Sequence, residues 1–323
     1  MNRTTDVAEG PTATGATATG VTVTVETALP APIVAALRTA PDPDPALDRS
    51  RVIEAAGVPF AVVEWGDPAG PPVVLVHGVT SSVETWWRIG PALAASGHRV
   101  VAMDLPGHGR TDHWNGHHRF RDAAADLAAF IRAAGLDRPD LRVVGHSFGA
   151  MAAAALPISG ISPRRLVLLD PPAAPRAGMR AMAEDPVERH YASVAEGAAV
   201  IRAAYPEWVR GDVIAKAIGL HRVEEAAARA ILLENGDWDG GVADLAAAAA
   251  GRVLPETWVV RADPAAGGLT FDPALPALAG VVGRERIITL AGAPHSPQRT
   301  HPVETVGALL EALGIGPGGR TPR

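Results

Sequence analysis

The chain has 323 residues, no cysteine and a formal net charge of −6, and 47% of its residues are hydrophobic. This composition suits a large α/β domain with an aliphatic core, and it excludes disulfides, cysteine metal ligands and a thiol nucleophile. The acidic balance offers no basic surface for nucleic acid and no apolar run approaches the roughly 18 residues of a membrane span, so we expect a cytoplasmic protein whose partner is a small molecule.

The first 50 residues differ in composition from the rest of the chain. Residues 11–20 form a low-complexity run dominated by Thr, Ala and Gly, and residues 41–45 alternate proline with aspartate. Closely spaced prolines prevent either a helix or a strand from continuing. We therefore predict that residues 1–50 are a disordered tail and that the folded part begins near residue 51.

From residue 51 onward, short apolar strands alternate with helices. The continuous apolar run at 73–76 is typical of a central parallel strand that is buried on both faces. The alternation predicts an α/β fold with a mostly parallel central sheet flanked by helices. In chain order, we expect strands at 52–54, 60–65, 73–76, 99–103, 141–144, 165–169, 257–261 and 286–290, and helices at 82–95, 119–134, 150–156 and 303–313.

One long segment breaks this alternation. Residues 171–250 show no strand pattern and consist of helical pieces rich in Ala, Arg and Glu, interrupted by prolines. A helical insertion near the C-terminal ends of parallel strands is placed to cover a site. We predict a helical cap at 171–250 on a core formed by residues 51–170 and 251–323.

The pentapeptide at residues 145–149 has the pattern G-x-S-x-G, with Ser147 at its centre. A predicted strand precedes it and a predicted helix follows it, which is the context of a nucleophile elbow. Glycines on both sides of the serine give the sharp turn the space that it needs. The sequence therefore predicts that Ser147 is a nucleophile presented above the sheet.

Three further motifs occur in a fitting order along the chain. His77-Gly78 follows the strand at 73–76, residues 104–109 read DLPGHG, and His295 follows the last predicted strand. With the G-x-S-x-G elbow, these motifs make the chain resemble the α/β-hydrolase fold family, in its capped serine-hydrolase branch, over roughly residues 51–315.

The resemblance assigns roles to a catalytic triad. Ser147 is the nucleophile and His295 the base, although proline takes the place of the glycine that usually precedes this histidine. The acid has two candidates, because both Asp263 and Asp170 follow strands and precede prolines. We expect Asp263 because its strand is the appropriate one, although its offset differs slightly from the family's, with Asp170 as the alternative.

The resemblance also implies an oxyanion hole formed by the backbone N–H groups of Phe148 and Val79. His77 is then a residue that shapes the loop. The histidines between His108 and His118, together with Asp112, match no spacing of metal ligands. No phosphate-binding or dinucleotide fingerprint occurs, so we expect neither a metal nor a cofactor.

These features predict a carboxylesterase-like serine hydrolase acting on a small to medium apolar ester, thioester or lactone through an acyl-enzyme. The same triad serves carbon–carbon bond hydrolases and cofactor-free perhydrolases or haloperoxidases, which remain as alternatives. A serine at the elbow argues against the epoxide hydrolase and haloalkane dehalogenase branches, which need a carboxylate there. The non-enzymatic alternative is a ligand-binding protein that keeps the fold.

Overall fold

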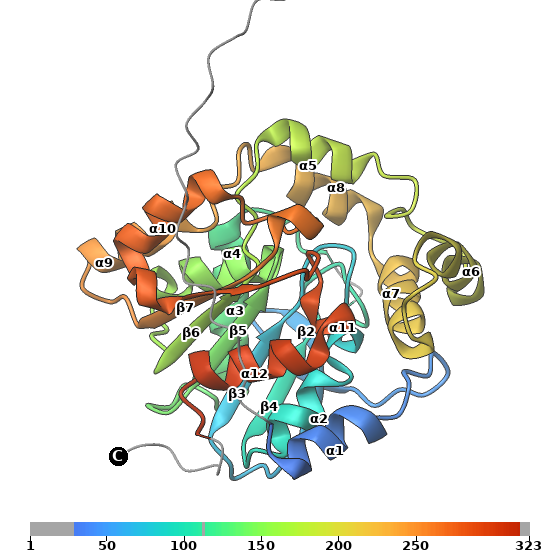
Figure 1. The fold of residues 1–323 in the computed structure, drawn as a ribbon, viewed down its shortest axis with the longest axis horizontal. Helices are drawn as coiled ribbons and strands as arrows, with labels where there is room; N and C mark the ends of the chain where they lie inside the picture. The colour runs from blue at the N-terminus through green and yellow to red at the C-terminus, as the bar shows by residue number, and fades with distance from the viewer. Residues whose placement is uncertain (1–28, 112–113, 317–323) are drawn as a thin grey trace, which may run out of the picture.

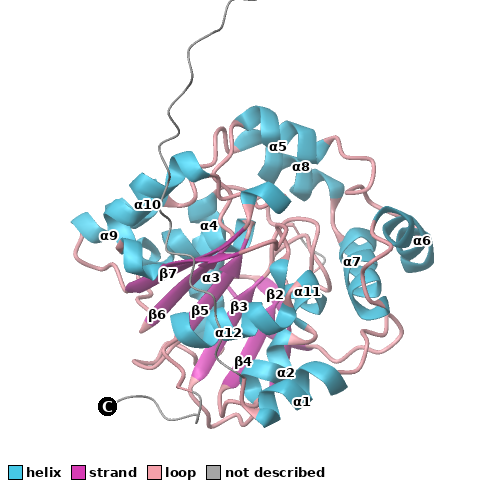
Figure 2. Ribbon diagram, viewed as in Figure 1, coloured by secondary structure: helices cyan, strands magenta, loops and turns pink. Residues whose placement is uncertain are grey.

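A computed structural model describes residues 29–111 and 114–316. Its centre is an eight-stranded sheet in the order β1-β2-β4-β3-β5-β6-β7-β8 (Figure 2). Strand β2 runs antiparallel to both of its neighbours, and every other pair is parallel, which confirms the predicted α/β class. The strands are β1 (Arg51–Ala55), β2 (Val58–Trp65), β3 (Pro72–Val76), β4 (Arg99–Met103), β5 (Arg142–His146), β6 (Arg165–Leu169), β7 (Glu256–Ala262) and β8 (Ile287–Leu290).

The apolar side chains of the strands form two hydrophobic core layers, one on each face of the sheet. In β3, which is buried throughout, Val74 and Val76 belong to one layer and Val73 and Leu75 to the other. This division follows from the two-residue period of a strand. The first layer is closed by α3 (Phe120–Ala133), α4 (Phe148–Ala155), α9 (Val242–Ala250) and α10 (Leu275–Val282), and the second by α1 (Ala31–Thr39), α2 (Ile89–Ala94) and α12 (Pro302–Ala312) (Figure 1).

Helix α1 lies inside the segment that the sequence predicts to be disordered. Its buried residues Ile33 and Leu37 are only 3% and 7% exposed, and they join the core layer that contains α2 and α12. The predicted tail of residues 1–50 is therefore wrong for this helix, because two apolar side chains one turn apart find a partner surface. Residues 1–28 lie outside the described residues.

The segment between β6 and β7 is helical. Its helices are α5 (Arg176–Ala183), α6 (Val194–Ala204), α7 (Arg210–Arg222), α8 (Glu225–Glu234) and α9. Helices α5 to α8 arch over one side of the sheet, whereas α9 returns to pack near α4 and α10 (Figure 1). Tyr191, Ile201, Val213 and Leu220 form a separate small apolar cluster, which gives the arch a core of its own.

Shorter helical turns join these elements. The predicted helix at 82–95 is divided into a 3₁₀ turn, Val83–Trp86, and α2. The short helix α11 (Pro297–Thr300) follows β8 and leads into α12. The remaining 3₁₀ turns are Leu156–Ser159, Pro264–Ala266, Asp272–Ala274 and Arg284–Arg286.

Candidate active site

The turn between β5 and α4 holds Ser147 in a strained conformation, with φ 55° and ψ −120°. A side chain at Gly145 would place its Cβ 2.1 Å from the carbonyl oxygen of Gly149. At Gly149 a Cβ would lie 2.5 Å from the carbonyl oxygens of Val76 and His77. Both glycines of the pentapeptide are thus sterically required, and the turn lifts Ser147 out of the sheet at the start of α4.

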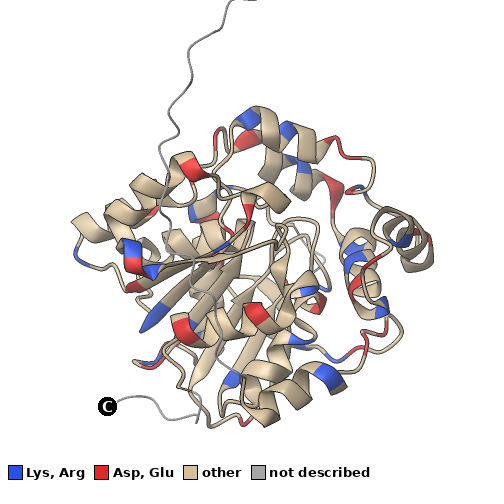
Figure 3. Ribbon diagram, viewed as in Figure 1, with Lys and Arg blue, Asp and Glu red and all other residues tan. Residues whose placement is uncertain are grey.

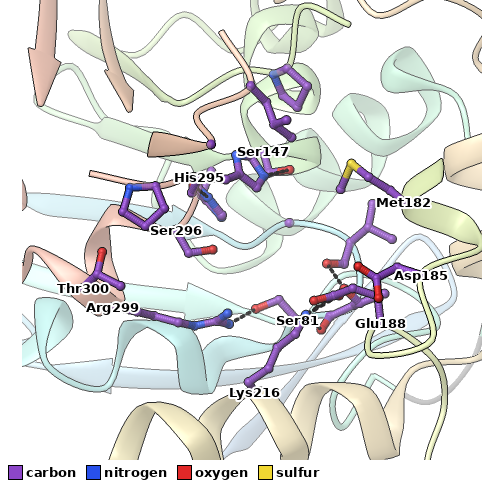
Figure 4. A pocket seen from close by; sticks show the side chains of 18 of the residues that line it. Ser81, Ser147, Met182, Asp185, Glu188, Lys216, His295, Ser296, Arg299 and Thr300 are labelled. Carbon is purple, nitrogen blue, oxygen red and sulfur yellow. Dashed lines mark hydrogen bonds and ion pairs between the residues drawn. The ribbon is translucent and has the colours of Figure 1, made fainter. Parts of the chain in front are cut away.

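A chain of two hydrogen bonds links Ser147, His295 and Asp170. Nε2 of His295 lies 3.0 Å from Oγ of Ser147, and Nδ1 lies 2.7 Å from Oδ2 of Asp170. The carboxylate can only accept at Nδ1, so the neutral ring carries its proton there and leaves Nε2 free to accept from the serine hydroxyl. Ser147 and His295 face the cavity together in Figure 4.

Asp170 lies at the end of β6 in the left-handed region, with φ 42°, and is fully buried. Besides His295, its carboxylate accepts hydrogen bonds from the N–H groups of Ala262 and Leu269 and from the hydroxyl of Thr270. Burial raises the pKa of Asp170, but the bond from His295, the positive charge that this ring carries when protonated, and the bonds from Leu269 and Thr270 together hold the pKa below its ordinary value. The environment therefore keeps this carboxylate ionised.

Asp263, the acid expected from the sequence, does not contact His295. Its carboxylate accepts from the N–H of Ala265 and from the N–H of Gly292, each at 2.9 Å. Those two bonds lower its pKa. The preference for Asp263 is corrected to Asp170 on this geometry: β6 and β7 are neighbours whose ends both approach the loop of His295, and Asp263 instead ties that loop to the end of β7.

Two backbone N–H groups, those of Phe148 and Val79, belong to segments that adjoin Ser147. Phe148 is the first residue of α4, and Val79 lies in the loop after β3. Among the described residues, neither N–H donates to a protein acceptor. A Cβ on Gly78 would lie 2.7 Å from Cβ of Ser147, so only glycine lets the Val79 loop come this close. Two N–H donors without a protein acceptor, on segments that adjoin Ser147, are what an oxyanion hole requires.

His77 holds the loop after β3 in place through two hydrogen bonds. It is fully buried, with Nδ1 donating to the carbonyl of Gly78 at 2.8 Å and Nε2 accepting from the N–H of Leu105 at 3.0 Å. Burial and the neighbouring His108 lower the pKa of His77 to about 3, which keeps the ring neutral and its tautomer fixed. This is the structural role expected from the sequence.

His146, inside the pentapeptide, has a role that the sequence analysis missed. Its Nε2 donates to the carbonyl oxygen of His295 at 2.8 Å, and the two ring centroids are 4.9 Å apart. Burial and the charge of His295 lower the pKa of His146 well below its ordinary value. A neutral His146 thus holds the backbone of His295 in place. The signal in the sequence that could have indicated this role is a histidine directly before Ser147.

A cavity of about 350 Å³ opens beside Ser147 and is lined by both the core and the helical arch. Its volume is that of a small-molecule site. One part of the lining is polar and includes Glu188, Lys216 and Arg299 (Figure 4), together with Thr80. The aromatic and methionine lining comprises Met179, Met182, Tyr205, Trp208 and Trp238, whereas Tyr191 packs in the apolar cluster of the arch.

Comparison with known proteins identifies the family of this chain. The model of the alpha/beta hydrolase fold matches residues 71–230, which include β3, the nucleophile turn, Asp170 and most of the arch. The chain belongs to the α/β-hydrolase fold family.

Curated relatives of this α/β-hydrolase have several activities. The 2-hydroxy-6-oxo-2,4-heptadienoate hydrolase of Pseudomonas putida is 38% identical over 123 residues, covering 37% of this chain and 43% of that protein. Epoxide hydrolase B of Mycobacterium tuberculosis is 37% identical over 89 residues, covering 27% and 24%. The non-heme chloroperoxidase of Streptomyces lividans is 38% identical over 86 residues, covering 27% and 30%. The chain thus spans less than half the length of these relatives.

Solved structures extend the similarity over most of the α/β-hydrolase core. E-2-(acetamidomethylene)succinate hydrolase superposes with a TM-score of 0.66 at 21% identity, over 82% of this chain and 98% of that one. The thioesterase domain from the curacin biosynthetic pathway gives 0.61 at 23% identity, with the same coverage. At such identities the likeness establishes the fold.

The described part of the α/β-hydrolase shows no cluster of three or more His, Asp or Glu side chains that could hold a metal ion. His108 is buried, and its Nδ1 lies 3.1 Å from the carbonyl of Pro106, while Asp112 and His113 lie outside the described residues. None of the helices within residues 29–111 and 114–316 is long and apolar enough to cross a membrane.

Proposed function

We propose that this α/β-hydrolase is a serine hydrolase that cleaves a small to medium ester, thioester or lactone through an acyl-enzyme on Ser147. The observation that carries the proposal is the hydrogen-bonded chain from Ser147 through His295 to Asp170, at 3.0 and 2.7 Å. It lies beside the N–H groups of Val79 and Phe148 and opens into a cavity of small-molecule size.

In the first half-reaction, Oγ of Ser147 attacks the carbonyl carbon while Nε2 of His295 takes the hydroxyl proton. The carbonyl oxygen becomes an oxyanion held by the N–H groups of Val79 and Phe148. Asp170 stays ionised and stabilises the imidazolium that forms. When the tetrahedral intermediate collapses, the bond to the leaving group breaks, and the leaving group takes its proton from His295.

In the second half-reaction, water replaces the alcohol or thiol. His295 removes a proton from the water as it attacks the acyl-enzyme, and the same N–H groups hold the second oxyanion. Collapse breaks the bond to Oγ of Ser147, which recovers its proton from His295. The helices that arch over the cavity act as a cap, limiting the access of bulk water and shaping the acyl site.

Two other reactions are alternatives, because the relatives include a 2-hydroxy-6-oxo-2,4-heptadienoate hydrolase and a non-heme chloroperoxidase. A carbon–carbon bond hydrolase uses the same triad on a ketone that fragments after attack, and a perhydrolase or haloperoxidase replaces water by hydrogen peroxide at the acyl-enzyme. Ser147 argues against the epoxide hydrolase reaction, in which a carboxylate forms the alkyl-enzyme. Ester cleavage is favoured because the reaction requires no catalytic group besides the triad and the two N–H groups.

The test is covalent labelling combined with ester hydrolysis. We expect a fluorophosphonate probe to label the folded protein at Ser147, and p-nitrophenyl acetate or butyrate to be turned over; Ser147→Ala should lose both activities with an unchanged melting temperature. A folded wild-type protein that neither labels nor turns over these esters would exclude the serine esterase. Saturable binding of small acyl compounds under those conditions would instead indicate a ligand-binding protein.

A further inference from the structure

One cationic side chain of the cavity has no acidic partner. Arg299 lies on α11, four residues after His295, and is only 6% exposed, yet it lines the cavity that contains Ser147. Among the described residues, no carboxylate forms an ion pair with it. Buried arginine is normally paired, because an isolated charge loses its hydration without compensation.

The contacts that Arg299 does make are weak. One terminal nitrogen lies 3.4 Å from Oγ of Ser81, a long hydrogen bond, and the guanidinium carbon lies 5.3 Å from the ring centroid of Trp208. Nε has no hydrogen-bond partner within the described part of the chain. Figure 4 shows the guanidinium directed across the cavity toward Ser81, with Ser296 and Thr300 on the same side. The group therefore retains donors that a ligand could use.

Two buried or half-buried carboxylates near Arg299 form ion pairs with other cations. Glu188 lies 2.5 Å from Nζ of Lys216, and Asp212 lies 2.5 Å from Arg88. These two acids, with Lys216, Arg88 and Arg299, leave one positive charge in excess. Figure 3 shows many charged residues on the outer helices and loops. Of this group, Glu188, Lys216 and Arg299 line the cavity, whereas the Arg88–Asp212 pair does not.

Two further carboxylates line the cavity without neutralising this charge. Asp185 is half-buried, and its carboxylate accepts from the N–H of Val187. Glu207 is exposed to solvent. An anion bound in the cavity would avoid both side chains by lying against α11, where Arg299 and Ser81 meet.

We propose that Arg299 binds a carboxylate of the substrate, remote from the scissile bond, so that the substrate class is an ester or thioester carrying one free acid group. A guanidinium matches a carboxylate with two parallel hydrogen bonds, and a buried site makes that pairing strong. Substrate would then supply the acidic partner that Arg299 lacks among residues 29–111 and 114–316. This inference rests on the proposed function of Ser147 and names the substrate class of the same cavity.

The experiment compares anionic esters with neutral esters of the same shape. For an acid on the acyl side, the pair is the p-nitrophenyl monoester of glutaric acid and its isostere with an isopropyl group in place of the carboxylate. For an acid on the alcohol side, the pair is the acetate ester of gamma-hydroxybutyrate and its isopropyl isostere. We expect the wild type to prefer the anionic member of at least one pair, expressed as kcat/KM.

Variants of Arg299 then link the preference to this side chain. Arg299→Met should lose about 10- to 100-fold in kcat/KM on the preferred anionic ester and change little on its isostere, and Arg299→Lys should keep part of the preference. Arg210→Met is the matched control, because Arg210 is an exposed arginine of the arch that pairs with Asp42 away from the cavity. It should leave both rates unchanged.

A binding measurement separates this inference from the proposed function. Glutarate, titrated by calorimetry, should bind the wild type and not Arg299→Met, and the uncharged diamide should bind neither. If Ser147 proves inert, this arm still decides the role of Arg299. Two results on the wild-type protein would overturn the proposal even if Arg299→Met fails to fold. One is equal binding of glutarate and its diamide. The other is the absence of a preference for the anionic ester in both substrate pairs.

Discussion

The carboxylate of Asp170 lies 2.7 Å from Nδ1 of His295, although 125 residues separate them in the chain. The contact is possible because β6 ends beside β7 in the parallel sheet, and β8, which leads to the loop of His295, lies next along. Besides His295, four donors contact the carboxylate: the N–H groups of Ala262, Leu269 and Thr270 and the hydroxyl of Thr270. With Nδ1 of His295 bound by Asp170, Nε2 is the ring nitrogen that meets Ser147.

The first prediction is that Asp170→Asn lowers kcat by about 10⁴-fold, the loss typical of a triad aspartate, because the amide favours the wrong imidazole tautomer. Asp263→Asn is the matched control: within the described part of the chain, its carboxylate accepts hydrogen bonds only from the N–H groups of Ala265 and Gly292. We expect that variant to lose less than about tenfold, through loosening of the loop. The measurement is steady-state hydrolysis of p-nitrophenyl butyrate. A larger loss from Asp263→Asn than from Asp170→Asn would contradict the assignment.

The sequence could locate Ser147, His295 and the Val79 loop of the proposed site because each belongs to a motif that depends on local geometry. Gly145 and Gly149 report the turn directly, since a Cβ at either position would meet backbone atoms. The acid is a non-local choice between the ends of two adjacent strands. Asp170 and Asp263 both precede proline, and only the path of the chain after β7, which brings Leu269 and Thr270 onto Asp170, distinguishes them.

A second prediction concerns His146, which holds the carbonyl of His295 at 2.8 Å. His146→Ala should lower kcat by about 10- to 100-fold with little change in KM, because a small displacement of the base weakens proton transfer more than binding. His146→Gln should recover part of the loss, since its amide can donate to the same carbonyl. His98→Gln, at a buried histidine elsewhere, is the control. Equal losses of kcat in His146→Ala and His98→Gln would reduce the role of His146 to packing.

The third prediction is a loss of stability on mild acidification. Burial is the main cause that lowers the pKa of His77 to about 3 and those of His98 and His108 to about 4, from 6.5. Their folded pKa values are depressed, so between about pH 4 and 6.5 the unfolded chain binds protons that the folded chain does not. Stability from these groups is present above pH 6.5 and decreases below it, by about 1.4 kcal/mol per pH unit for each histidine.

The measurement is the free energy of unfolding in urea between pH 5 and pH 8. We expect it to fall as the pH decreases, and His108→Gln to fall less steeply than the wild type. Exposed His190→Gln provides the control with the same substitution. A wild-type stability that is flat or rises between pH 6.5 and pH 5 would contradict the prediction.

The fold was predictable where hydrophobic periodicity is long and unbroken. The apolar run at 73–76 predicts a buried strand, and β3 is buried on both faces. The segment of α1 could be predicted as one or two helical turns, but it was assigned to a disordered tail because the partners of Ile33 and Leu37 lie on α2 and α12, which are remote in sequence. The prolines at 41–45 correctly mark an interruption, but the interruption follows an ordered helix.

The last prediction tests that helix. Leu37→Ala should lower the free energy of unfolding by about 2–4 kcal/mol, because Leu37 is only 7% exposed and its removal leaves a cavity beneath α1. Arg38→Ala, the exposed neighbour in the same helix, should change stability by less than about 0.5 kcal/mol. Urea denaturation provides both values. Since α1 lies on the face of α2 and α12 and not at the cavity, hydrolysis by folded Leu37→Ala should match the wild type; equal stabilities of the two variants would mean that α1 does not pack on the core.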